Sequence, residues 1–485
     1  MILSTDAALS PLRNIARVGI ASASVLALTA TGLMAASGAE AASDSFTSTG
    51  AMATARQGAT VALTSHGTVL VAGGYNGSAN LATTSVYQPD SGTFTTGPTM
   101  STARNGAVSA SLNNGLVLIA GGYNGSEVGT AQLYDPSNNT LSTAGGLAMA
   151  VADAAAAKLN DGRVLVTGGL VGVNEQAYSQ YYNPTGGPGG SFTATSAMGL
   201  ARTSMTATTL ANGNVLVAGG SNFSGSSTYA SAEIFNATNN TYAPTGSMAA
   251  PRFAATATLL PNGKVLIAGG SNGSGTLNGT ELYDPNGASF SSGPSMAAAR
   301  KYATSTLLSD GRVLIAGGMD SGAYLSSSEI YNPTTNSFSA GPTMTAARGQ
   351  TAATRVASGQ VLIPGGIGTG SAYLSSADLF TPAPVPPVAV PQSLVNCSAL
   401  PRKIKRTGTT VVLKRRCLTS SGQSLSVSIK RVGKVKKTAK VTRKADGKVS
   451  VRTRNSRGLK LRVTRSAPAS AGFQAYAQVK VYKIK

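Results

Sequence analysis

Histidine, cysteine and tryptophan are scarce in this chain of 485 residues, which contains one histidine, two cysteines and no tryptophan. The single histidine, His66, precedes a glycine in a predicted hairpin turn, so a Ser-His-Asp triad is not expected. The cysteines, Cys397 and Cys417, have no histidine nearby that would complete a metal site with them. We therefore expect no cofactor and no metal.

Acidic residues are nearly missing from the C-terminal part of the chain. Residues 394–485 contain 25 basic residues and one acidic residue, Asp446, whereas residues 42–393 contain 12 basic and 14 acidic residues. The net charge of +22 for the whole chain therefore comes from one C-terminal module. A basic face of this kind binds polyanions with a strong salt dependence.

Long apolar runs are absent except for one near the N-terminus. Val18–Ala35 is a moderately apolar run of small residues, preceded by Arg13 and Arg17 and followed by the cleavage-like sequence Ala39-Glu40-Ala41. We predict that residues 1–41 are a secretory signal peptide, that no membrane span remains after its removal, and that the protein is extracellular. A transmembrane anchor is the alternative, although the run is marginal for a stable span.

The most informative feature that is present is a repeat. Seven Gly-Gly doublets follow one another at intervals of 48, 47, 51, 50, 48 and 48 residues. The doublets are Gly73-Gly74, Gly121-Gly122, Gly168-Gly169, Gly219-Gly220, Gly269-Gly270, Gly317-Gly318 and Gly365-Gly366. A fixed period near 50 residues, built from strand patterns alone, is typical of the blades of a β-propeller.

Each repeat predicts four strands. An apolar run ends at each doublet, and six residues earlier a glycine follows His, Asn, Asp or Ser, which predicts a tight hairpin turn with positive φ at both central residues. The strand before this turn has small side chains, which suit the innermost strand of a propeller. A third strand ends in an aromatic residue such as Tyr87 or Tyr283. A fourth strand carries Phe94, Leu141, Phe192, Tyr242, Phe290 or Phe338.

This pattern resembles the kelch repeat, which combines a hairpin glycine, a Gly-Gly doublet, a Tyr-Asp-Pro-like turn and a bulky fourth-strand residue. The resemblance covers roughly residues 44–382, but the tryptophan of the family's fourth strand is Phe, Tyr or Leu here. The seventh repeat has no fourth strand after Phe380, and Phe46 and Met52 fit a fourth strand without a blade. We therefore predict an all-β fold with a seven-bladed kelch-like β-propeller over residues 42–381, closed by its N-terminal strand.

The repeats also resemble the propeller of copper-radical carbohydrate oxidases. Those enzymes require two histidines, tyrosines and a Cys-Tyr crosslink at copper. The repeats here contain one histidine and no cysteine, so the resemblance does not extend to copper chemistry. Paired carboxylates remain open, because Asp153 and Asp320 are candidates to face the channel, although no spacing argues for them.

One recurring feature is an arginine four residues after a methionine. The pairs are Met52/Arg56, Met100/Arg104, Met198/Arg202, Met248/Arg252, Met296/Arg300 and Met344/Arg348. In the third repeat Met149 is followed by Asp153 instead. Two interpretations are open. The six arginines form a cationic, ligand-binding ring at one channel mouth that Asp153 interrupts, or each arginine bonds backbone carbonyls between blades.

A second candidate binding set is the loop after each doublet. The residues of these loops include Tyr75, Asn76, Tyr123, Asn124, Asn222, Asn272 and Asp320. The kelch resemblance implies a ligand-binding face at these loops. Tyr and Asn suit sugar or peptide recognition, because they combine a flat apolar ring with an amide that both donates and accepts hydrogen bonds. The alternative is that Asn and Gly only form turns.

Residues 382–393 contain five prolines and predict a semi-rigid linker. Alternating apolar residues beyond it predict a small, basic, β-sandwich-like domain over residues 394–485, in which Cys397 and Cys417 form a disulfide after export. The densest basic clusters contain Lys403, Lys405, Arg406, Lys414, Arg415, Arg416, Arg431, Lys434, Lys436 and Lys437. We expect an anionic cell-wall or surface polymer as their partner rather than nucleic acid, because aromatic residues for base stacking are few.

These features lead to one hypothesis and two alternatives. The hypothesis is a secreted, non-enzymatic binding protein whose propeller recognises carbohydrate or protein and whose basic domain attaches to an anionic surface. The first alternative is a non-redox carbohydrate-active enzyme of the lyase or mutarotase type, which would use the arginines and channel carboxylates. The second is a purely architectural surface protein, since a fold does not imply a function.

Overall fold

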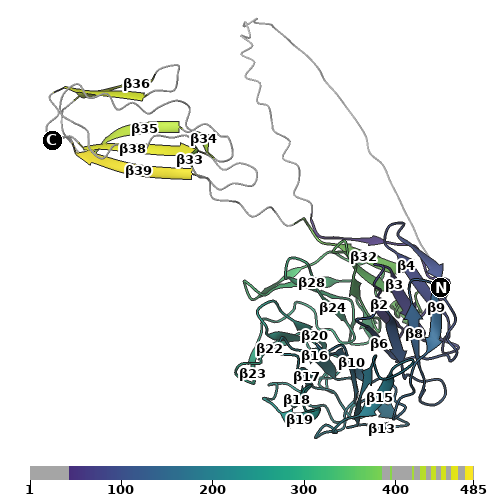
Figure 1. Cartoon of the computed structure of the whole chain (residues 1–485). Helices are drawn as coiled ribbons and strands as arrows, with labels where there is room; N and C mark the ends of the chain where they lie inside the picture. The colour runs from purple at the N-terminus through teal and green to yellow at the C-terminus, as the bar shows by residue number, and fades with distance from the viewer. Residues whose placement is uncertain are drawn as a thin grey trace, which may run out of the picture. The chain divides into compact units, whose positions relative to one another are not determined.

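The computed structural model describes residues 43–384 and, beyond them, the backbone of seven strands between residues 394 and 483. Residues 43–384 form seven four-stranded antiparallel sheets around one axis (Figure 1). The innermost strands form a closed circle, because each one contacts the innermost strands of the two neighbouring sheets. The prediction of an all-β, seven-bladed propeller is confirmed.

The blades are numbered along the chain, and their strands are given from the axis outward. Blade 1 contains β2 (Thr60–Leu63), β3 (Val69–Ala72), β4 (Thr84–Gln88) and β5 (Thr93–Thr96). Blade 2 contains β6 (Val108–Ser111), β7 (Val117–Ala120), β8 (Ala131–Asp135) and β9 (Thr140–Thr143). Blade 3 contains β10 (Ala155–Lys158), β11 (Val164–Thr167), β14 (Ser179–Asn183) and β15 (Ser191–Ala194). Blade 4 contains β16 (Thr206–Thr209), β17 (Val215–Ala218), β18 (Ala232–Asn236) and β19 (Thr241–Pro244).

The remaining blades repeat this order. Blade 5 contains β20 (Thr256–Leu259), β21 (Val265–Ala268), β22 (Thr280–Asp284) and β23 (Ser289–Ser292). Blade 6 contains β24 (Thr304–Leu307), β25 (Val313–Ala316), β28 (Ser328–Asn332) and β29 (Ser337–Ala340). Blade 7 contains β30 (Thr354–Arg355), β31 (Val361–Pro364), β32 (Ala377–Thr381) and β1 (Ser45–Ser48). Loops carry the hairpins β12 (Leu170–Val171) with β13 (Asn174–Glu175) and β26 (Met319–Asp320) with β27 (Ala323–Tyr324), and the short 3-10 helix η1 (Thr369–Ser371).

The N-terminal strand closes the ring, as predicted. β1 pairs antiparallel with β32 and places Phe46 opposite Phe380, with ring centroids 5.3 Å apart. Just before β1, both oxygens of Asp44 accept hydrogen bonds from Arg312, at 2.7 and 3.0 Å. Asp44 also accepts one from the backbone N–H of Ala383 at 2.7 Å, so one carboxylate joins both ends of the propeller to blade 6.

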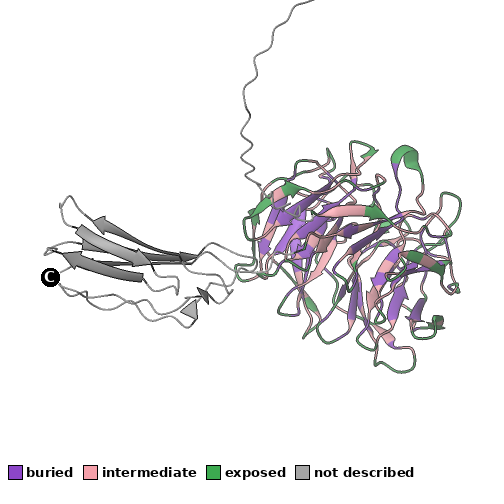
Figure 2. Cartoon of the chain, turned by 90° about the horizontal axis from the view of Figure 1, so that it is seen from above, coloured by how far each residue is buried: buried purple, intermediate pink, exposed green. Residues whose placement is uncertain are grey.

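Burial follows the position of each strand within its blade. The second strand of every blade is buried at all four positions. Exposed residues lie at the turns and on the outermost, fourth strands (Figure 2). Farther out, an aromatic ring on the third strand contacts one on the fourth, with centroids 4.9 to 5.2 Å apart. These pairs are Tyr87–Phe94, Tyr182–Phe192, Phe235–Tyr242, Tyr283–Phe290 and Tyr331–Phe338. Two smaller rings thus supply the apolar contact expected of a fourth-strand tryptophan.

The hairpin turns differ from the prediction in one respect. Only the glycine of each pair has a positive φ, of 80° to 92°, and the residue before it does not. In five of the turns the preceding Asn or Asp instead accepts a hydrogen bond from the N–H two residues later, as Asn262 does from Lys264. The expectation of two left-handed residues was wrong, because Asn and Asp are used here for their side-chain oxygen.

Beyond residue 384 the structure describes strands alone. They are β33 (Leu394–Val395), β34 (Leu418–Thr419), β35 (Ser426–Val432), β36 (Thr438–Arg443), β37 (Val449–Arg454), β38 (Lys460–Ala467) and β39 (Tyr476–Lys483). All pair antiparallel, as β33–β34, β36–β37 and β35–β38–β39. Most of the predicted alternating segments fall on these strands, while the sandwich arrangement stays a prediction.

Several predictions fall outside the described residues. These are the signal peptide, most of the linker, the Cys397–Cys417 disulfide, and all the basic residues named for the C-terminal clusters except Arg431, whose backbone lies in β35. Within the described part of the chain, no helix has the length and apolar character needed to cross a membrane.

Candidate functional site

The six repeated arginines lie between blades. Each is buried, with 0 to 3 % of its surface exposed. In all six, Nη1 donates to the carbonyl oxygen of the first doublet glycine in the following blade, as Arg104 does to Gly121, at 2.7 to 2.9 Å. The backbone of the same arginine bonds the preceding blade, since the Arg104 carbonyl accepts from Gly74 N–H. Arg56, Arg104, Arg202, Arg252, Arg300 and Arg348 therefore join consecutive blades, and the predicted cationic ring at the channel mouth is not formed.

Four of these arginines also have a carboxylate partner on the third strand. The pairs are Arg202–Glu233 at 3.0 Å, Arg252–Glu281 at 2.8 Å, Arg300–Glu329 at 2.9 Å and Arg348–Asp378 at 2.6 Å. Ser85 and Gln132 occupy the equivalent strand position for Arg56 and Arg104. Burial lowers the pKa of Arg56 and of Arg104 to about 10. It also lowers the pKa of Arg202, Arg252 and Arg348, but there the carboxylate acts against the shift.

Asp153 does not occupy the arginine position of the third repeat. Val151 does, because its carbonyl accepts from Gly122 N–H just as the Arg104 carbonyl accepts from Gly74 N–H. The prediction that aligned Met149 with the other methionines was therefore wrong by two residues. Asp153 aligns with Gly106, two residues beyond Arg104, and it lies at the channel mouth instead of pairing with a neighbouring arginine.

Two residues after each arginine position, the chain adopts a left-handed conformation at the mouth of the central channel. The residues and their φ values are Gly58 (59°), Gly106 (62°), Asp153 (50°), Ser204 (54°), Ala254 (51°), Tyr302 (55°) and Gln350 (53°). At six of the seven junctions, the N–H of one such residue donates to the carbonyl of its counterpart in the preceding blade, at 2.9 to 3.2 Å. At the junction of blades 3 and 4, the Thr203 hydroxyl donates to the Asp153 carbonyl at 3.4 Å.

This belt of hydrogen bonds holds five non-glycine residues in a strained conformation. Left-handed backbone costs a residue other than glycine on the order of 1 kcal/mol, and such strain persists only where the surroundings impose it. It tends to collect at functional sites. We therefore take the channel mouth as the candidate site, because the strained backbone there orients the side chains that surround it.

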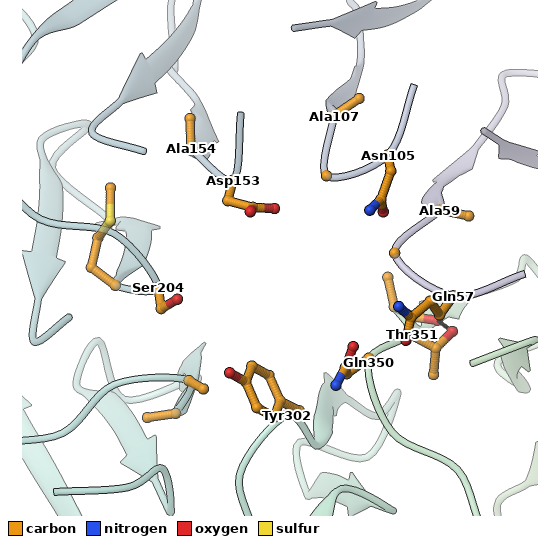
Figure 3. Close-up of a pocket in the computed structure, with 16 residues that line it drawn as sticks. Gln57, Ala59, Asn105, Ala107, Asp153, Ala154, Ser204, Tyr302, Gln350 and Thr351 are labelled. Atoms are coloured by element: carbon orange, nitrogen blue, oxygen red, sulfur yellow. Dashed lines mark hydrogen bonds between the residues drawn. The ribbon is translucent and has the colours of Figure 1, made fainter. Parts of the chain in front are cut away.

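The channel mouth encloses a cavity of about 510 Å³. Its polar side chains surround an open space (Figure 3), and they are Gln57, Asn105, Asp153, Ser204, Tyr302, Gln350 and Thr351. A Cβ atom on Gly58 would overlap the Asn105 carboxamide, and one on Gly106 would overlap the Asp153 carboxylate, so these two glycines make room for their neighbours. Alanines, glycines and Met205 complete the lining between these polar side chains.

Asp153 is the only charged residue that lines this cavity. Its side chain is exposed to the solvent inside the cavity, but the surrounding channel walls reduce its hydration and so raise its pKa. Burial also raises the pKa of Tyr302, with smaller contributions from the negative charges of Asp153 and Tyr324. The mouth thus offers amide, hydroxyl, phenol and carboxyl groups, and the described lining contains no cation.

The predicted post-doublet loops surround this mouth. Tyr75 pairs through its backbone with Gln57, and Tyr123 pairs with Asn105, which places loops and mouth on one face, here called the doublet face. The carboxamide oxygens of Asn76, Asn222 and Asn272 accept hydrogen bonds from backbone N–H groups of their own loops. These contacts fit turn formation.

The other predicted loop residues have different surroundings. The Tyr75 hydroxyl donates to the Gly77 carbonyl at 2.8 Å, whereas Tyr123 leaves 43 % of its surface exposed. Asn124 begins a tight turn, with its N–H donating to the Ser126 carbonyl. Asp320 lies in the β26–β27 hairpin and does not line the mouth, so the carboxylate pair with Asp153 that the sequence left open is not formed there.

The sequence analysis missed most of the residues that line the mouth. Gln57, Asn105, Ser204, Tyr302 and Gln350 were not among its candidates. A signal for them exists, because the two residues after each arginine differ from repeat to repeat while the residues around them recur.

One solved structure with a similar fold is a fungal alcohol oxidase of the AA5 family in complex with copper. It is 14 % identical, its TM-score is 0.55, and the match covers 91 % of this chain and 98 % of that chain. This likeness concerns the fold alone. No curated protein matches the chain.

The residues at the channel mouth do not fit a copper centre of the kind that the oxidase resemblance implies. The described residues that line the mouth include no imidazole and no thiol, and His66 lies in the β2–β3 turn on the opposite face. Nor do any three His, Cys, Asp or Glu side chains of residues 43–384 gather as a possible metal site.

The kelch motif matches three stretches of the chain, at residues 59–101, 252–297 and 300–345. The first stretch covers most of blade 1, and the other two cover blades 5 and 6. The unmatched blades share the same strand order, doublets and hydrogen bonds between blades. The chain is a kelch-repeat β-propeller.

Proposed function

We propose that the propeller is a binding module that takes a carbohydrate at the channel mouth. The observation that carries this proposal is the belt of strained residues, which surrounds an open cavity with amide, hydroxyl and carboxyl groups. Sugar hydroxyls both donate and accept hydrogen bonds, and Asn105, Gln57 and Gln350 match them in both roles. The fixed backbone limits the entropy lost on binding.

The same lining supports binding over hydrolysis. Glycoside hydrolases generally need two carboxyl groups on either side of the scissile bond, and Asp153 is the only carboxylate among the residues lining this mouth. A lyase or mutarotase using the repeated arginines is disfavoured too, because each is buried and bonded to carbonyl groups. A non-enzymatic role is therefore the function that we propose.

A glycan-binding assay tests this proposal. Full-length protein is passed over immobilised neutral glycans in high salt, and the dissociation constant is then measured for the glycan retained best. Asn105→Ala should weaken binding about threefold to tenfold, the cost of roughly one hydrogen bond. Asn124→Ala is the matched control, because it removes the same group from the same face outside the mouth. Equal affinity of both variants, or turnover of the bound glycan, would contradict the proposal.

We also propose that the basic C-terminal region attaches the secreted protein to an anionic surface polymer. The support is its charge of 25 basic residues against one acidic residue, which exceeds what solubility requires. Retention of the full-length protein on such a polymer should fall steeply with salt. Replacing Lys434, Lys436 and Lys437 by glutamine should flatten that dependence, and an unchanged salt profile would count against attachment through this region.

A further inference from the structure

A second cavity adjoins the channel mouth on the doublet face. It measures about 450 Å³ and lies over the loops of blades 2, 3 and 4. Asn105 and Asp153 line both cavities, so the second one continues the first. We call it the blade 2–4 groove. Each cavity by itself has a volume typical of a small-molecule site, and two in succession suit a ligand longer than one sugar ring.

Exposed apolar side chains gather at this groove. Tyr123, Val173 and Phe223 line it and expose 43 %, 65 % and 51 % of their surfaces. They are three of the four large apolar side chains exposed in residues 43–384. Scattered exposed apolar residues are ordinary, but their concentration around one cavity indicates contact with a ligand. Flat rings at the surface suit the C–H face of a sugar.

Carboxylates fix the loops that carry these side chains. Glu127 of the blade 2 loop accepts a hydrogen bond from Gly172 N–H of the blade 3 loop at 2.9 Å. Glu175 of the blade 3 loop accepts one from Phe223 N–H of the blade 4 loop at 3.3 Å. The three loops are therefore linked in series, and the groove is largely formed before a ligand arrives.

The charge of the groove has one sign. Among residues 43–384, Glu127 and Asp153 are the charged residues that line it, and no lysine or arginine does. Lys301 belongs to blade 6, where its ammonium lies 5.8 Å from the ring centroids of Phe253 and Tyr302. Such a surface repels acidic polymers and attracts cations, and carboxylates beside aromatic rings favour ammonium groups.

We infer that the ligand is a chain of amine-bearing sugar units, running from the channel mouth into the blade 2–4 groove. This inference rests on the proposed carbohydrate-binding function. The mouth bonds the hydroxyl groups of one unit, the rings of Tyr123 and Phe223 contact the apolar faces of the next, and Glu127 and Asp153 pair with protonated amines.

The test compares an oligomer of β-linked glucosamine with its fully N-acetylated counterpart. Binding of each to the full-length protein is measured by calorimetry at the highest pH at which the sugar amines are still protonated, because the pKa of Asp153 is raised and its carboxyl has to stay ionised. The free-amine oligomer should bind at least about tenfold more tightly, since a charged partner is gained at two carboxylates. Phe223→Ala should weaken the binding of both oligomers about tenfold, because the ring of Phe223 contacts the apolar face of either sugar.

Glu127→Gln separates charge from loop structure, because glutamine keeps the oxygen that accepts from Gly172 N–H. It should weaken the free-amine oligomer about threefold to fivefold and leave the acetylated one unchanged. Asp320→Asn is the matched control, since it removes one half-buried carboxylate from the same face outside the groove. It should change neither affinity.

Each outcome bears on a different part of the account. Equal binding of both oligomers, or an effect of Asp320→Asn as large as that of Glu127→Gln, overturns the inference and leaves the proposed function intact. Tighter binding of a lysine peptide than of the glucosamine oligomer assigns the groove to a basic peptide and also overturns it. Failure of every glycan, neutral or cationic, overturns both the inference and the proposed function.

Discussion

Arg56 and Arg104 are buried cations with no carboxylate partner, whereas the other four repeated arginines each have one. All six satisfy the doublet carbonyl in the same way, so the difference lies in a single third-strand side chain. Burial of an unpaired charge is costly, and the lowered pKa values of these two arginines express that cost. Blades 1 and 2 therefore contain sites where one substitution can add stability.

Gln132→Glu should stabilise the propeller by about 1 to 2 kcal/mol, because it gives Arg104 the partner that Arg252 has in Glu281. Gln132 already accepts from Ser101 N–H through Oε1, and a carboxylate can keep that bond. The measurement is the midpoint of urea unfolding followed by circular dichroism.

Gln180→Glu in blade 3 is the control for this substitution. Val151 replaces the arginine there, and the Gln180 amide donates to the Met149 carbonyl at 2.9 Å, a bond that a carboxylate cannot make. It should destabilise the protein. Stabilisation by both substitutions would show that added negative charge, and not the arginine, is responsible.

Arg300→Met should destabilise the propeller by about 3 to 5 kcal/mol, because it leaves Glu329 as an unpaired buried charge and orphans the Gly317 and Ser327 carbonyls. Adding Glu329→Gln should recover part of the loss. Urea unfolding of both variants measures this. A normal midpoint for Arg300→Met would contradict the role of the arginines between blades.

At the scale of single elements, β1 closes the ring through strand pairing and through the Asp44 carboxylate. Burial acts to raise the pKa of Asp44, but hydrogen bonds from Arg312 and Ala383 N–H outweigh it, so the pKa lies below its usual value. A carboxyl with a lowered folded-state pKa stabilises the protein above its unfolded pKa, near 4, and loses this effect as pH falls through the folded value.

Asp44→Asn should therefore lower stability by about 1 kcal/mol at neutral pH, the weight of a partly solvated charged pair. The difference from the wild type should shrink as pH falls below about 4, since the wild-type carboxyl is then protonated as well. Thermal unfolding across a pH series measures it. A difference that stays constant down to the lowest pH would show that Asp44 does not act through its charge.

The strands and turns could be predicted from the sequence wherever residues within the same repeat determine them. The doublets, the hairpin glycines and the aromatic residues of the third and fourth strands recur in register, and together they predicted seven blades and the closing strand. The third repeat was misaligned because Met149 was taken as the counterpart of Met100. Leu147 fills that place and contacts Gly121. An apolar position accepts Leu or Met equally, so residue identity was a poor guide there.

At the scale of the whole molecule, the site arises from residues that no single repeat predicts. Asp153, Tyr302 and Gln350 come from blades 3, 6 and 7, and they line one cavity only because the blades close into a ring. The sequence analysis placed the binding face at the post-doublet loops, which do surround the mouth. The left-handed positions could not be recognised from the sequence, because their residue types range from glycine to tyrosine and only the backbone conformation is shared by all seven.

Hydrogen exchange of the full-length protein, with and without the glycan that it retains best, tests the central claim most directly. The account predicts that bound glycan slows exchange around residues 57–59, 105–107, 153–154 and 302, and leaves the hairpin turns on the opposite face unchanged. Protection confined to those turns would contradict a binding site at the channel mouth, and so would no protection at saturating glycan.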